Sequence, residues 1–219
     1  MCCSFRSSFL VMYKTLLLIL VLMATGFTLS AQTTPFEEQA NGQVAFAYGI
    51  KGGLSLSFPV ADYWNDQTGT RPGVHARKGL QLGVVGLLPL NKYWSVRTGL
   101  DYSAQGYNAQ ALGSGIFTED DVKHTYIHLP VTMQYNVTRS SCLYTGFTGG
   151  YRIGKPDDYK RSDLLWSIGA SLINTWHWGF DARYSTGLVN IAPESHPYFA
   201  RMKNKTLQLS LIFLFTEKE

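Results

Sequence analysis

Hydrophobic and polar residues alternate with a period of two along most of this chain. Such alternation is typical of β-strands with one apolar and one polar face. It predicts strands at residues 48–58, 78–88, 93–106, 122–135, 142–153, 164–174, 178–188 and 205–215. After residue 31, no long segment shows the 3.6-residue apolar period of an amphipathic helix.

The connections between these strands alternate strictly between short and long. The short ones cover residues 89–92, 136–141 and 175–177, and the longer ones cover 59–77, 107–121, 154–163 and 189–204. Outer-membrane barrels have short periplasmic turns and longer extracellular loops. The sequence therefore predicts an all-β fold, an eight-stranded antiparallel up-and-down transmembrane β-barrel.

The composition of the two faces indicates which one lines the lumen. The polar face is rich in glycine and serine, as in Gly49, Gly53 and Gly99, whereas a water-exposed face usually carries long charged side chains. The lumen of an eight-stranded barrel is only just wide enough for side chains to fill it. We therefore expect the polar face to point inward and apolar residues to face hydrocarbon, among them Leu100, Val131 and Leu209.

Five charged residues fall on the predicted inner face, and we expect them to form a lumenal charge network. Arg97 lies three residues above Trp94, and Asp181 lies three residues above Trp178 on the strand expected across the barrel. Buried charges are costly unless they are paired. At least one arginine should therefore contact an aspartate within about 4 Å. The five residues are Lys51, Arg97, Asp101, Asp181 and Arg183.

Aromatic residues gather near the predicted strand ends, as expected of the two interfacial girdles of a membrane barrel. Ordinary β-propensity also enriches aromatic residues in strands. The residues that we assign to the short-turn end are Tyr93, Trp94, Tyr135, Trp176, Trp178 and Phe215, and those assigned to the long-loop end include Tyr107, Trp166 and Tyr184.

The first residues have the order of a secretory signal. Basic residues precede an apolar run at residues 16–24, and small residues come before Gln32. We expect residues 1–31 to be a cleaved signal peptide, 32–43 a short periplasmic segment and 44–219 the barrel domain. The apolar run is shorter than the roughly 20 residues that span a membrane.

Composition and motifs argue against several other functions. Only 16% of residues are charged, the net charge is +4, and no concentrated basic stripe suggests a nucleic-acid partner. Ser195 and His196 are adjacent, but a catalytic pair is defined by geometry rather than by sequence proximity. His75, His124 and His177 are spread over different segments and do not predict a metal site. We expect no enzyme activity, no cofactor and no metal.

Several segments resemble the PorT-like outer-membrane β-barrel domain family. The resemblance is carried by residues 48–57, 94–102, 126–130 and 184–191 and by the Leu/Phe-rich last strand, and it covers about residues 44–216. His128-Leu129 departs mildly from the family's Tyr-x-x-Ile-Pro pattern. The resemblance implies a small barrel in the bacterial outer membrane, with Phe215 as the terminal aromatic read by the assembly machinery. By analogy it also suggests an accessory role in protein secretion of the type IX kind.

Two classes of function remain open at this point. The favoured one is a non-enzymatic outer-membrane barrel with a structural, scaffold or surface-interaction role exerted through its extracellular loops. Its expected partners are outer-membrane lipid, the assembly machinery during biogenesis and a protein at the loops. The alternative is a narrow pore or a lipid-modifying enzyme, although a packed lumen argues against a pore.

Overall fold

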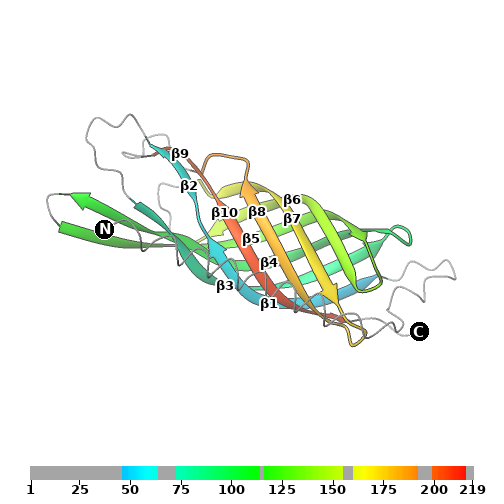
Figure 1. Cartoon of the computed structure of the whole chain (residues 1–219). Helices are drawn as coiled ribbons and strands as arrows, with labels where there is room; N and C mark the ends of the chain where they lie inside the picture. Colours follow the sequence, from blue (N-terminus) through cyan, green and yellow to red (C-terminus); the bar gives the residue numbers. More distant parts are fainter. Residues whose placement is uncertain (1–45, 64–72, 114–115, 155–159, 192–198, 216–219) are drawn as a thin grey trace, which may run out of the picture. The chain divides into compact units, whose positions relative to one another are not determined.

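The computed structural model describes residues 46–63, 73–113, 116–154, 160–191 and 199–215. Eight strands close an antiparallel barrel in the order β1-β10-β8-β7-β6-β5-β4-β3 (Figure 1). The predicted fold class is therefore confirmed. The barrel strands are β1 (Ala47–Ser57), β3 (Gly73–Pro89), β4 (Trp94–Gly113), β5 (Ile116–Asn136), β6 (Ser141–Ile153), β7 (Ser162–Ile173), β8 (Trp178–Gly187) and β10 (Lys205–Phe215).

The short turns are stabilised by side chains that cap the backbone. Asn91 Oδ1 accepts hydrogen bonds from the backbone N–H groups of Tyr93 and Trp94, at 2.9 and 3.0 Å. Asn174 Oδ1 does the same for two backbone N–H groups of the turn between β7 and β8. Asparagine favours turns because its side chain can replace a backbone acceptor.

The prediction that residues 107–121 form a loop was wrong. β4 and β5 stay paired without a register change from Tyr107↔Val122 to Gly113↔Ile116, beyond the last pairing of β5 with β6 at Thr125. They form a β4–β5 ribbon at the long-loop end, and the start of β3 pairs with β4 along it from Ala76↔Tyr107 to Gly73↔Gln110 (Figure 1). The polar composition of this segment suggested a loop, but the ladder depends on backbone hydrogen bonds that any such residue can make. Tyr107 is only 4% exposed, so it is not a lipid-facing girdle residue.

Two of the other predicted long connections also contain strand. β2 (Val60–Tyr63) pairs with β9 (Phe199–Lys203) in a separate two-stranded sheet. Its pairing Val60↔Lys203 continues the register of Ser57↔Thr206 in β1 and β10. β2, which follows β1, and β9, which precedes β10, therefore continue the pairing of these two barrel strands past the long-loop end of the barrel.

The two faces of the barrel have opposite polarity. The outer face exposes apolar side chains, including Leu100 at 50%, Val131 at 53% and Leu209 at 57%. The inner face is buried and mostly polar, except for an apolar cluster of Val85, Leu87, Ile212 and Leu214 at the short-turn end. Among the described residues, no helix is long and apolar enough to cross a membrane.

The expected signal peptide (1–31) and periplasmic segment (32–43) lie outside the described residues. Both remain predictions.

Candidate functional site in the barrel lumen

A buried triad of charges lies in the middle of the lumen, contributed by three different strands. Lys51 Nζ on β1 donates to Asp101 Oδ2 on β4 at 2.9 Å. Arg183 Nη2 on β8 donates to the same oxygen at 2.5 Å, and Arg183 Nε donates to Gln208 Oε1 on β10 at 2.7 Å. The Asp101 side chain is 0% exposed, and those of its two partners are at most 4% exposed. The carboxylate is thus shared by two cations away from water.

A second pair lies beside this triad. Arg97 Nη2 on β4 donates to Asp181 Oδ1 on β8 at 2.9 Å. The same oxygen also accepts hydrogen bonds from Ser171 Oγ and from the Tyr144 hydroxyl. The Arg97 guanidinium lies 4.3 Å from the centroid of the Tyr144 ring. A buried ion pair is stabilising only when such additional hydrogen bonds satisfy its polar atoms.

The structure therefore brings all five predicted lumenal charges into direct contacts, which include two arginine–aspartate pairs within 4 Å. Three of these side chains are cationic and two are anionic, so the network carries a formal charge of +1. The role of the network as a functional element remains a prediction. The neutral partners Tyr144, Ser171 and Gln208 were not predicted from the sequence. Their strand parity was the available signal, since each alternates with outward-facing apolar residues.

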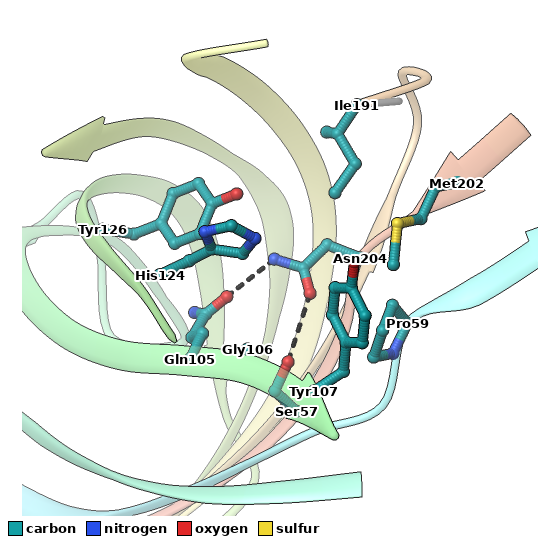
Figure 2. A pocket seen from close by; sticks show the side chains of 10 residues that line it. All are labelled: Ser57, Pro59, Gln105, Gly106, Tyr107, His124, Tyr126, Ile191, Met202 and Asn204. Atoms are coloured by element: carbon teal, nitrogen blue, oxygen red, sulfur yellow. Dashed lines mark hydrogen bonds between the residues drawn. The ribbon is translucent and has the colours of Figure 1, made fainter. Parts of the chain in front are cut away.

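A layer of amides and aromatic rings closes the lumen toward the long-loop end. Asn204 Nδ2 donates to Gln105 Oε1 at 2.6 Å, and Ser57 Oγ donates to Asn204 Oδ1 at 3.4 Å (Figure 2). Gln105 Nε2 lies 2.9 Å from His128 Nε2, and the Tyr126 ring stacks on His128. Ser57, Gln105, Tyr126 and Asn204 also line a pocket, together with Pro59, Tyr107, Ile191 and Met202 among others (Figure 2).

The lumen is thus filled over its length by three kinds of side chain. The apolar cluster lies at the short-turn end, the charge network in the middle and the amide layer at the long-loop end. Glycines on the inner face allow this crowding. A Cβ atom at Gly83 would collide with the Asp101 side chain, and one at Gly169 would collide with the Tyr144 ring.

The eight predicted interface aromatics lie on the outer surface. Seven are at least 38% exposed, and Tyr184, which is half-buried, stacks on Phe58 with ring centroids 6.3 Å apart. At the short-turn end the rings contact one another across strands, as in Trp94 with Tyr135 at 5.0 Å and Trp178 with Phe213 at 4.7 Å. Their place at a lipid interface remains a prediction.

The other candidate chemistry gains no support from the described part of the chain. Ser195 and His196 lie outside it. Among the described residues, no group of three His, Cys, Asp or Glu side chains is placed to hold a metal ion. His75 lies on β3 and is exposed, His124 is buried on β5, and His177 is in the turn between β7 and β8.

A closed barrel with an apolar outer face and a polar, ion-paired interior defines a class, the small membrane β-barrels. Within that class the chain belongs to the outer membrane protein beta-barrel domain family, whose model matches residues 24–192. The protein is therefore an integral barrel of the bacterial outer membrane. The PorT-like subfamily remains an interpretation of the sequence.

Three solved barrels illustrate the similarity in structure. OprG of Pseudomonas aeruginosa is 14% identical with a TM-score of 0.47, over 80% of this chain and 98% of OprG. Ail of Yersinia pestis is 17% identical with a TM-score of 0.42, over 79% and 100%. Neisserial surface protein A is 13% identical with a TM-score of 0.48, over 77% and 99%. No curated protein is significantly similar to the chain in sequence. The assignment to the family rests on the family match alone.

Proposed function

We propose that this protein is a non-enzymatic outer-membrane barrel with a sealed lumen, and that it acts in a scaffold or surface-interaction role through its long-loop end. The observation that carries the proposal is the ion-paired network across the lumen. Both of its carboxylates are buried and ion-paired with the protein's own lysine and arginines, so their charge is already compensated without a solute.

The filling of the lumen supports this proposal over a narrow pore. A water path would have to pass the apolar cluster, the charge network and the amide layer in turn. Asp101, Gln105 and Leu87 represent these layers, and each is at most 1% exposed. Eight-stranded barrels generally hold side chains rather than an aqueous channel.

The long-loop end offers the surface through which a sealed barrel would act. It carries the β4–β5 ribbon and the β2–β9 sheet, whereas the described connections between strands at the opposite end are short turns. Extensions of this kind at the extracellular face of a membrane barrel are where partners can reach it. An accessory role in protein secretion, suggested by the resemblance to PorT-like barrels, would be one form of such an interaction.

Solute uptake and lipid analysis distinguish this proposal from both alternatives. Liposomes that contain the refolded full-length protein should swell in an isosmotic sugar solution no faster than protein-free liposomes. Lipids extracted after incubation should have unchanged masses. Swelling at a porin-like rate would support the pore, and protein-dependent loss or gain of an acyl chain would support the enzyme. Either result would overturn the proposed function.

A further inference from the structure

Three lysines lie on the outward face of the barrel at its long-loop end. Along β9 and β10, Met202 and Asn204 are buried, whereas Lys203 is exposed and Lys205 is partly exposed. On β3, the exposed Lys78 shares its outward parity with Leu80, which is 64% exposed. All three lysines therefore project away from the lumen, toward the surroundings of the barrel.

The register of the sheet brings these lysines together. Leu56 on β1 pairs with Lys78 on one side and with Leu207 on the other, and Lys205 lies two residues above Leu207. With strands about 4.8 Å apart and a rise of about 3.4 Å per residue, the Cα atoms of Lys78 and Lys205 are roughly 12 Å apart. Lysine has a flexible four-carbon stem, so the ammonium groups of Lys78 and Lys205 can converge on one headgroup. Lys203 lies two residues beyond Lys205 with the same outward parity.

Apolar and aromatic side chains lie between the lysines. Leu56, Phe58 and Leu207 face outward between them, and the Phe58 ring stacks on Tyr184 of β8. Thr186, the register partner of Lys205, adds a hydroxyl at the same edge. An apolar surface with cationic side chains at its edge is complementary to a lipid with an apolar acyl chain and an anionic headgroup.

The opposite end of the same strands lacks this arrangement. There the outward face is formed by Tyr48, Phe213, Phe215 and Trp178 with apolar neighbours, and the rings contact one another. Within the described parts of β1, β3, β8 and β10, no charged side chain projects outward at the short-turn end. The exposed basic residues Lys92 and Arg139 at that end lie in the short turns rather than on the apolar outward face of the strands.

We propose that Lys78, Lys203 and Lys205 bind the phosphate of an anionic lipid headgroup in the leaflet around the long-loop end, with an acyl chain against Phe58 and Leu207. The site is distinct from the lumen, so it stands or falls independently of the proposed function.

Native mass spectrometry of the full-length protein in detergent tests this site. The probe is bis-phosphorylated lipid A, compared with the same glycolipid after removal of its phosphates. The test variant is K78Q/K203Q. The matched control is K92Q/K160Q, which removes two exposed lysines located elsewhere on the barrel. The heat-dependent shift of folded barrels on SDS gels confirms that each variant is folded.

The wild-type protein and the control should retain the phosphorylated lipid equally. K78Q/K203Q should bind it roughly 30-fold more weakly, as expected for two basic groups next to an anionic lipid. The dephosphorylated lipid should be retained weakly by all three proteins. Equal losses in both variants, or equal retention of both lipids by the wild type, would overturn the proposal.

Discussion

Asp101→Ala is the substitution that most directly disturbs the lumen, because this carboxylate is shared by two cations. Without it, Lys51 has no other hydrogen-bond acceptor among the described residues, whereas Arg183 keeps its bond to Gln208. Removing one partner of a buried ion pair generally costs about 3–5 kcal/mol, since an uncompensated charge is left behind. We expect a loss of free energy of unfolding in this range.

A second substitution should restore part of this lost free energy of unfolding. Asp101→Ala combined with Lys51→Met removes the stranded ammonium group and leaves an apolar side chain of similar length. The double variant should be destabilised by only about 1–3 kcal/mol, because substitutions of residues in one network are not additive. Thr148→Ala provides a neutral control. The Thr148 hydroxyl lies 2.9 Å from Ser167 Oγ in the lumen, and its loss should cost about 1 kcal/mol.

The assay is reversible urea unfolding of the full-length protein in lipid vesicles, followed by tryptophan fluorescence. A double variant at least as unstable as Asp101→Ala would refute the stranded-charge argument. A loss no larger than that of Thr148→Ala for the single variant would show that the pair contributes little.

Three further predictions concern the membrane face, the crowded lumen and the amino terminus. Leu209→Arg should lower the free energy of unfolding by about 2–4 kcal/mol in the same assay. Val189→Arg, beyond the end of β8, should lower it by at most about 1 kcal/mol. Equal losses would contradict the assigned faces. Gly169→Ala forces a methyl group into an aromatic ring and should cost about 1–3 kcal/mol. Gly149→Ala meets no atom within 4 Å and should be close to neutral, so equal effects would mean the lumen is not crowded. Mass spectrometry of protein from outer membranes should show a chain that begins at Gln32, and an intact chain from Met1 would exclude cleavage.

The eight strands of the barrel and their inward parity could be predicted from the sequence because both follow from the alternation of apolar and polar residues. A residue on a half-buried strand is apolar or polar according to the face it occupies, so Leu209 and Ser210 indicate their faces directly. The partners Arg97 and Asp181 could be matched because up-and-down topology fixes which strands lie opposite and length along a strand gives height.

Other features could not be predicted because they depend on groups that have no sequence signature. The β4–β5 ribbon is held by backbone hydrogen bonds, to which asparagine and glycine contribute as well as valine does. The amide layer depends on a hydrogen bond between Asn204 and Gln105, which are 99 residues apart in the sequence. Asn204 also lies in a segment whose composition had indicated a loop. The lysine cluster arises from the closure of β1 against β10, which brings the two ends of the barrel domain side by side.

Single-channel recording in planar lipid bilayers tests the central claim, a lumen sealed by paired charges, most directly. The full-length wild-type protein, inserted at a density verified by immunodetection, should produce no conductance steps above the bilayer baseline. A porin recorded in the same chamber serves as the positive control. Reproducible, long-lived steps of porin size from the wild-type protein would contradict the account.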